Sequence, residues 1–245
     1  MSTRTSHDAF RLLGDEPDPR EQVDTTGLRF KCTTDASPQA SLEAVLDATE
    51  GFVPLWVKGT VLRWRFHPDS LARFEYPDAV RKEVRQLMNA GMEAWGSAAP
   101  ITLDERNDNW DFEVIVRKGD DCDKDGCTLA QAFFPDGGRH QLLLFPLLFK
   151  QDPAEQLATI AHELGHVYGL RHFFADLSEQ DSPSVIYGTH DPFTIMNYGA
   201  RSVLTEADKS DLARLYEAAW AGKLKQVKGT PIRFFQPYHA SGVAA

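Results

Sequence analysis

Residues 162–172 read HELGHVYGLRH, and this stretch decides the fold. Residues four apart on a helix share one face, so His162 and His166 can direct their imidazole rings at one metal ion. Glu163 lies one step round the helix. From there its carboxylate can reach a water bound to the metal but is poorly placed as a ligand.

The second half of the stretch supplies a turn and a third ligand. Gly169 follows the second histidine by three residues and can adopt positive φ, which would end the helix and turn the chain sharply. That turn would bring His172 back to the same metal ion. The spacing therefore predicts a zinc site with three histidine ligands and a carboxylate beside the bound water.

The composition excludes several classes of protein. The chain has 245 residues, of which 42% are hydrophobic and 25% charged, as expected for one large soluble domain or two small ones. Its net charge of -10 argues against nucleic acid, because a phosphate-binding surface needs concentrated Lys and Arg. No apolar run approaches the roughly 18 residues that span a bilayer. We expect neither nucleic acid nor a membrane as a partner.

The compartment is left undetermined by the sequence. No apolar segment follows the positive charge near the N-terminus, so no secretory signal peptide is readable. The three cysteines, Cys32, Cys122 and Cys127, are odd in number and too few for a disulfide scaffold.

The chain divides into three parts. We interpret residues 1–50 as a polar N-terminal arm, with a short helix over 38–49 behind Ser37 as N-cap. Residues 51–222 form the expected domain. Residues 223–245 are interpreted as a polar tail with one apolar patch.

Within the domain, periodicity predicts alternating strands and helices. Apolar residues at every second position indicate strands, and spacings of three and four indicate helices. Asp152 followed by Pro153, and Thr205 followed by Asp208, predict the starts of two helices. The predicted strands are 60–66, 110–117, 128–134 and 141–145, and the predicted helices are 77–95, 152 onwards and 205–220.

An acidic loop precedes the third strand. Asp121, Asp123 and Asp125 followed by glycine match the opening of a calcium-binding loop, although the glutamate that closes such a loop is lacking. A solvated turn and a disulfide between Cys122 and Cys127 are alternatives, and ion and disulfide are compatible with each other.

The histidine stretch matches the HExxHxxGxxH signature of the metzincin zinc peptidases, and Ile195-Met196-Asn197-Tyr198 resembles their Met-turn. Leu129 to Pro135, with His140 five residues on, resembles the edge strand and following loop of matrix metalloproteinases. The resemblance covers about residues 55–220. It implies an α+β, metzincin-type catalytic domain: a twisted mixed sheet with an antiparallel edge strand, two long helices packed on it, and a C-terminal helix below the cleft.

The resemblance also implies roles for single residues. His162, His166 and His172 would bind catalytic zinc, and Glu163 would be the general base. Tyr198 matches the astacin and serralysin pattern, in which this tyrosine is a fifth zinc ligand and stabilises the oxyanion.

Two further roles are structural or concern the substrate. Met196 would form a hydrophobic floor beneath the metal. An extended substrate would pair with the edge strand by β-augmentation, along Leu129, Ala130, Gln131 and Ala132.

Some residues depart from each subfamily. Gln131 stands where matrix metalloproteinases have a histidine that holds a second, structural zinc, and His140 alone cannot replace that site. Phe173 after the third histidine fits none of the subfamilies. The segment from His172 to Met196 is longer than in matrix metalloproteinases.

The expected function is that of a monomeric zinc endopeptidase acting on proteins or peptides. The alternatives are a catalytically silent metzincin-like domain that binds peptides, since fold and ligands do not guarantee activity, and hydrolysis of a non-peptide amide. Secretion is suggested by the family resemblance alone.

Two hypotheses would make the arm an inhibitory pro-segment. Cys32 could ligate the zinc, as a pro-segment cysteine does in matrix metalloproteinases, although the surrounding glycine and proline are missing. Asp15 in Leu13-Gly14-Asp15 faintly resembles the astacin aspartate that has this role. The third interpretation is an unstructured tail.

Overall fold

The protein is built on one mixed five-stranded sheet. The computed structural model describes residues 9–14, 29–34, 51–171, 194–196, 202–227 and 229–241. The order of the sheet is β4-β3-β5-β9-β8, with β8 antiparallel to β9 at the edge and the other pairs parallel. The strands are β3 (Val61–Phe66), β4 (Thr102–Glu105), β5 (Phe112–Val116), β8 (Ala130–Gln131) and β9 (His140–Leu144).

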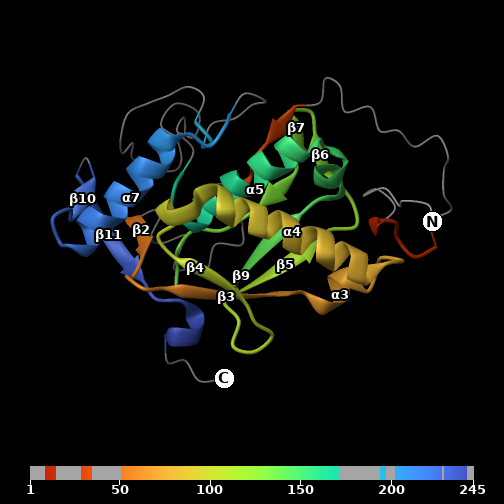
Figure 1. Ribbon diagram of the computed structural model, residues 1–245, viewed down its shortest axis with the longest axis horizontal. Coiled ribbons are helices and arrows are strands. Elements are labelled where there is room, and N and C mark those ends of the chain that lie inside the picture. The colour runs from red at the N-terminus through yellow and green to blue at the C-terminus, as the bar shows by residue number, and fades with distance from the viewer. Residues whose placement is uncertain are drawn as a thin grey trace.

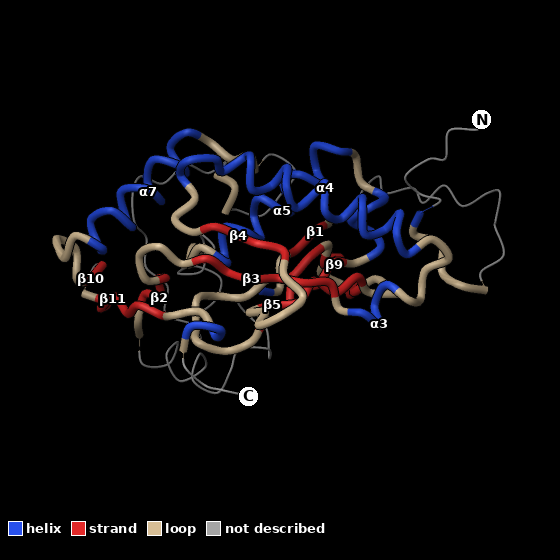
Figure 2. Tube along the Cα trace, turned by 60° about the horizontal axis from the view of Figure 1, so that its bottom comes forward, coloured by secondary structure: helices blue, strands red, loops and turns tan. Residues whose placement is uncertain are grey.

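The long helices lie on one side of this sheet (Figure 2). They are α4 (Pro77–Trp95), α5 (Pro153–Val167) and α7 (Glu206–Trp220). In Figure 1, α4 and α5 cross the strands and α7 lies at the end of the domain beside β2 and β11. This arrangement confirms the predicted α+β fold with an antiparallel edge strand, two long helices packed on the sheet and a C-terminal helix.

Short helical elements connect these layers. The α-helix α3 (Pro68–Leu71) precedes α4. Three 3₁₀ helices are η2 (Gly96–Ala98), η3 (Pro146–Lys150) and η4 (Tyr238–Ala240). No helix among the described residues combines the length and the apolar character that a membrane span needs.

The helix starts are set by side-chain caps. The Asp152 carboxylate accepts hydrogen bonds from the backbone N–H groups of Ala154 and Glu155, and Pro153 opens α5. Thr205 and Asp208 form a reciprocal capping box at α7. Because such caps satisfy N–H groups that have no partner within the helix, the predicted starts agree with the observed ones.

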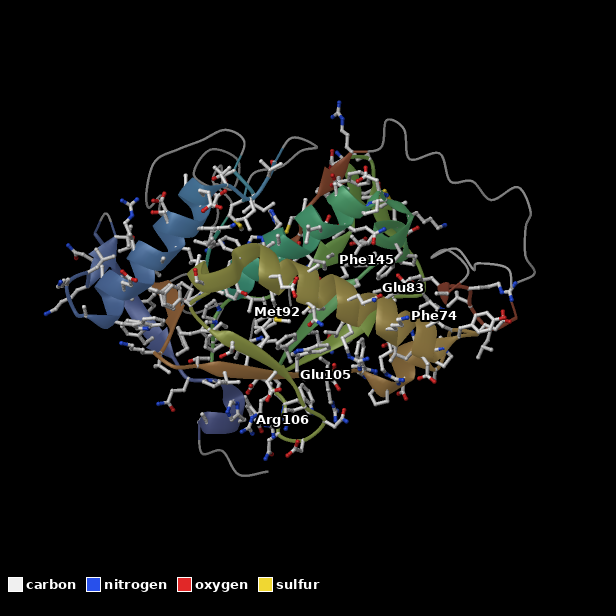
Figure 3. All side chains as sticks on the ribbon, in the orientation of Figure 1. Phe74, Glu83, Met92, Glu105, Arg106 and Phe145 are labelled. Carbon is white, nitrogen blue, oxygen red and sulfur yellow. A yellow bond between two sulfur atoms is a disulfide. The ribbon has the colours of Figure 1, made fainter. Side chains whose placement is uncertain are left out.

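Figure 3 draws the side chains of these elements, and the buried hydrophobic residues that form the core come from both the helices and the sheet. Alternate residues of β3, Leu62, Trp64 and Phe66, are buried, as their spacing predicted. At the crossing of α4 and α5, a β-carbon on Gly91 would come within 2.6 Å of the Ile160 side chain, so only glycine allows the helices to approach this closely. The histidine motif therefore lies on a helix packed directly against the core.

The segment interpreted as a polar tail is partly a strand. Residues 230–235 form β11 (Thr230–Phe235), which pairs in parallel with β2 (Val53–Trp56) and antiparallel with β10 (Gln226–Val227). The exposed, weakly patterned side chains of β11 concealed this pairing, which joins residues far apart in the sequence. β2 and β4 were also absent from the predicted elements, and the helix predicted over 38–49 lies outside the described residues.

Buried hydrogen bonds hold the C-terminal end of α5 against β2 and α7. The Tyr216 hydroxyl accepts from the Trp56 backbone N–H at 3.2 Å and donates to the Tyr168 carbonyl at 2.9 Å. The Trp56 indole donates to the Val167 carbonyl at 2.7 Å. Burial raises the pKa of the Tyr216 phenol, so this group stays protonated and able to donate.

We expect Tyr216→Phe to lower the free energy of unfolding by about 2 kcal/mol, because two buried backbone groups lose their partner. Chemical denaturation measures the change. Tyr238→Phe is the control, since its hydroxyl makes no hydrogen bond within the described residues, and it should stay within about 0.5 kcal/mol of wild type. Equal stabilities for the two variants would contradict this role of Tyr216.

Candidate metal centre

Two histidines of α5 converge at one point. The Nε2 atoms of His162 and His166 lie 3.1 Å apart. The Nδ1 of His162 lies 2.6 Å from the Ile195 carbonyl oxygen, and the Nδ1 of His166 lies 2.8 Å from the Leu170 carbonyl oxygen. A carbonyl oxygen can only accept a hydrogen bond, so each Nδ1 carries the proton and each Nε2 keeps a lone pair for a metal ion.

The helix ends just after the second histidine. Gly169 has a φ of 91°, and a β-carbon there would come within 2.5 Å of the Pro54 carbonyl oxygen, so both conformation and space require glycine. Its N–H donates to the His166 carbonyl, and the Leu170 N–H donates to the Gly165 carbonyl. This turn is the one expected to lead to His172. Both His172 and Tyr198 lie outside the described residues.

Glu163 is buried beside the two histidines and is contacted by the arm. Its side chain is only 2% exposed. The Cys32 thiol lies 3.4 Å from Oε1, and the Thr34 hydroxyl donates to Oε2 at 2.9 Å. The carboxylate predicted to face a metal-bound water is therefore covered by residues from the N-terminal arm.

Cys32 completes a three-atom cluster. Its Sγ lies 3.4 Å from the Nε2 of His166, and the ligand atoms of Cys32, His162 and His166 all lie within 4.8 Å of one another. Tetrahedral zinc, with bonds of about 2.0 Å to nitrogen and about 2.3 Å to sulfur, needs ligand atoms roughly 3.3 to 3.6 Å apart. The separation of 3.4 Å between Cys32 and His166 lies in this range, and the 3.1 Å between the two histidines lies just below it. Asp15, the other residue considered as an inhibitory group of the arm, lies outside the described residues.

Met196 packs under the motif helix. Its side chain is buried, and a β-carbon on Gly165 would come within 2.5 Å of the Met196 sulfur. The preceding residue, Ile195, supplies the carbonyl that orients His162. The turn that holds Met196 thus lies against α5 at the level of the histidines.

The edge strand is shorter than predicted and is covered by the arm. Only Ala130 and Gln131 pair with β9. The Gln131 side-chain amide donates to the Thr33 carbonyl and hydroxyl at 3.1 and 3.0 Å, and the Ala132 N–H donates to the Thr34 hydroxyl at 3.0 Å. Thus Gln131 and Ala132, which are predicted to contact substrate, contact the arm in this structure. The other two predicted residues, Leu129 and Ala130, are buried.

The arm also adds a strand beside the acidic hairpin. β1 (Phe30–Lys31) pairs in parallel with β7 (Gly126–Thr128), which pairs with β6 (Asp121–Asp123). A β-carbon on Gly126 would come within 2.6 Å of the Arg29 carbonyl oxygen. The same carbonyl accepts a hydrogen bond from the Cys127 N–H. Lys31 forms an ion pair with Asp123. Backbone pairing and charge therefore align the arm with the sheet edge.

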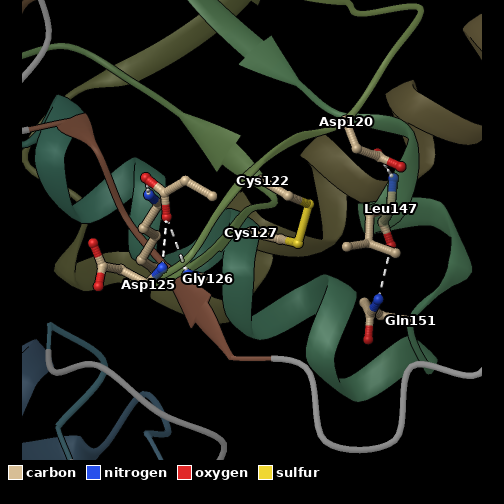
Figure 4. Close-up of a disulfide and its surroundings, with 9 residues drawn as sticks. Asp120, Cys122, Asp125, Gly126, Cys127, Leu147 and Gln151 are labelled. Carbon is tan, nitrogen blue, oxygen red and sulfur yellow. Dashed lines mark hydrogen bonds and ion pairs between the residues drawn. A yellow bond between two sulfur atoms is a disulfide. The ribbon is translucent and has the colours of Figure 1, made fainter.

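The hairpin itself is closed by a disulfide between Cys122 and Cys127 (Figure 4). Asp123 accepts from the N–H groups of Asp125 and Gly126, which tightens the turn. The hydrogen bond from Lys31 lowers the pKa of Asp123 below its usual value.

Calcium gains no support from this geometry. Among the described residues, the cluster of Cys32, His162 and His166 is the one group of three or more ligand atoms close enough to hold a metal ion. The carboxylates of Asp121, Asp123 and Asp125 do not form such a group.

His140 is held by other partners. Its Nε2 lies 2.8 Å from the Asp136 carboxylate, and its ring stacks on Phe133 at 4.3 Å. Gln131 faces the arm instead. Within the described part of the chain, His140 and Asp136 belong to no group of three metal ligands.

Sequence reasoning missed Thr33 and Thr34. Their contacts with Gln131, Ala132 and Glu163 join residues about 100 or more positions apart. Two threonines in a polar arm give no local signal for such contacts. Of these neighbouring residues, only Cys32 gave such a signal, because a cysteine can ligate zinc.

Comparisons with known proteins give one match in sequence and matches in structure. No family model matches the chain. Human stromelysin-3 is 32% identical over 104 residues, which cover 38% of this chain and 21% of stromelysin-3. The chain thus spans about a fifth of the length of this relative.

Two structures of myroilysin also match. One has a TM-score of 0.45 at 15% identity, covering 84% of this chain and 98% of myroilysin. The other has a TM-score of 0.42 at 18% identity, covering 66% and 95%. At these scores neither match bears on the function.

We expect cobalt(II), supplied to the full chain in place of zinc, to show a thiolate-to-metal charge-transfer absorption. The reason is the position of Cys32 within the cluster. Cys32→Ser should remove that absorption while cobalt stays bound to the histidines. Because the other two cysteines form a disulfide, no other thiolate can produce the signal. An absorption that persists in Cys32→Ser would contradict ligation by Cys32.

Proposed function

We propose that this chain is a zinc-dependent endopeptidase whose N-terminal arm holds it in a latent form. The observation that carries the proposal is the convergence of the His162 and His166 Nε2 atoms, with the buried Glu163 carboxylate beside them. The HExxHxxGxxH spacing and the partial similarity to stromelysin-3 support it further.

His162 and His166 would hold the zinc together with His172, and Met196 would pack beneath the site. Zinc, when bound, polarises the substrate carbonyl and lowers the pKa of a bound water toward about 7. Glu163 takes a proton from the attacking water at its carboxylate and passes it to the leaving amine. Tyr198 would donate a hydrogen bond to the developing oxyanion and act as a fifth ligand at rest.

The proposed substrate is an extended segment of protein or peptide. The Ala132 backbone N–H donates to the Thr34 hydroxyl, so it would become available to a peptide once the arm leaves. Pairing along this edge would supply affinity through the backbone, with side-chain pockets supplying selectivity. The domain is proposed to act as a monomer.

The arm acts in this proposal as an inhibitory pro-segment. Cys32 would be the zinc ligand in the latent form, in the position that the attacking water needs. The Cys32 distances to His166 and Glu163, both 3.4 Å, support this role.

Two alternatives predict different behaviour. A silent peptide-binding domain would hold zinc but cleave nothing. A hydrolase for non-peptide amides would cleave small amides but no peptide. The buried Glu163 at the metal cluster favours an enzyme, and a peptide library read by mass spectrometry separates the three.

We expect Glu163→Gln to lower peptide cleavage by at least about a hundredfold, because the general base is lost while the ligands remain. The measurement uses full-length protein carrying Cys32→Ser, so that the inhibitory thiol is absent, and zinc content is determined in parallel. Glu155→Gln, two turns earlier on α5, is the matched control. Wild-type cleavage by zinc-loaded Glu163→Gln, or cleavage unaffected by a chelator, would overturn the proposal.

We expect full-length Cys32→Ser to cleave peptides roughly tenfold faster than wild type. Each 1.4 kcal/mol of lost arm binding shifts the ratio of closed to open protein tenfold. Cys32→Ser keeps the size of the side chain but removes the preferred soft ligand. Equal initial rates for the two proteins would exclude Cys32 as the inhibitory group.

A further inference from the structure

We propose that Thr34 is a second lock of the latent form, acting through its hydroxyl on both the general base and the substrate-binding edge. This inference rests on the proposed function. It extends that function to two contacts of the Thr34 hydroxyl that do not involve the Cys32 thiol. A single hydroxyl would then withhold two groups that the reaction needs.

The Thr34 hydroxyl acts both as a hydrogen-bond donor and as a hydrogen-bond acceptor. It donates to the Glu163 Oε2 at 2.9 Å and accepts from the Ala132 N–H at 3.0 Å. A hydroxyl has one hydrogen to donate, so that hydrogen is committed to the carboxylate. Thr34 is 3% exposed and Glu163 2%, which shields the hydrogen bond between them from water.

Each partner is a group with a proposed task. Glu163 has to accept a proton from water, and the Thr34 hydroxyl occupies one of the two carboxylate oxygens that this water could approach. Ala132 is the first residue beyond the paired residues of β8, so its N–H is suited to an incoming peptide carbonyl. Thr34 therefore competes with both the water and the substrate.

Neighbouring contacts keep Thr34 in this position. Gln131 holds the Thr33 carbonyl and hydroxyl, and the Thr34 N–H donates to the Cys32 sulfur at 3.4 Å. Because this hydrogen bond links Cys32 to Thr34, loss of one residue's contacts should loosen the other. Coupling of this kind is measurable without any catalytic turnover.

The test measures the rate at which iodoacetamide alkylates Cys32 in the metal-free, full-length chain. Cys32 is the only thiol, since the other two cysteines are joined. Thr34→Val keeps the shape but removes the hydroxyl, and it should raise the rate roughly tenfold, as expected for loss of a hydrogen bond to a charged group. Thr34→Ser restores the hydroxyl and should react at nearly the wild-type rate. A wild-type rate for Thr34→Val would overturn the proposal.

A double-mutant cycle separates the hydrogen bond from a merely structural effect. In a Glu163→Ala background the acceptor is gone, so adding Thr34→Val should change the alkylation rate less than the same substitution does in wild type. An equal change in both backgrounds would assign Thr34 to packing alone and overturn the proposal. If Thr34→Val does not fold, judged by circular dichroism, Thr34→Ala takes its place in the same cycle.

Peptide cleavage by zinc-loaded protein then tests directly whether the Thr34 hydroxyl contributes to inhibition in addition to Cys32. Thr34→Val should raise the rate above wild type, and Cys32→Ser combined with Thr34→Val should exceed either single variant. A double variant no faster than Cys32→Ser alone would overturn the proposal. Absence of cleavage from every variant would count against the proposed function, whereas the alkylation rates would still decide the role of Thr34.

Discussion

The candidate site depends on two hydrogen bonds from histidine rings to backbone carbonyls. Without the Ile195 and Leu170 carbonyls, the rings of His162 and His166 could rotate and either nitrogen could carry the proton. With them, both Nε2 lone pairs point at one place. Each carbonyl belongs to a turn and not to a helix interior, so the turns at Gly169 and Met196 matter as much as the helix that carries the histidines.

These turns are themselves held by the core. Gly165 leaves room for the Met196 sulfur, and Gly169 leaves room for the Pro54 carbonyl. The buried Tyr216 hydroxyl donates to the carbonyl of Tyr168, the residue just before Gly169, and so helps to fix this turn. The geometry of the candidate metal centre is therefore a consequence of packing between α5, β2 and α7, and a change in that packing would be transmitted to the ring nitrogens.

Local signals in the sequence predicted the helices and the cluster. Asp152 and Thr205 mark helix starts by their own side chains, and His162 and His166 meet because they share one helix face. The signals failed where contacts are distant along the chain. β11 pairs with β2 across about 180 residues, and Thr34 meets Glu163 across 129. Nothing local in a threonine specifies such a partner, whereas the chemistry of Cys32 did suggest one.

The arm that covers Glu163 belongs to the same chain as the site. Contact between them is intramolecular, so its strength is set by an effective concentration, typically in the millimolar range for a short tether, and not by the amount of protein present. In the proposed latent form, dilution would not release the arm, and a micromolar substrate would compete poorly with it. Release would instead follow a chemical event, either at the Cys32 sulfur or in the backbone that links the arm to the domain.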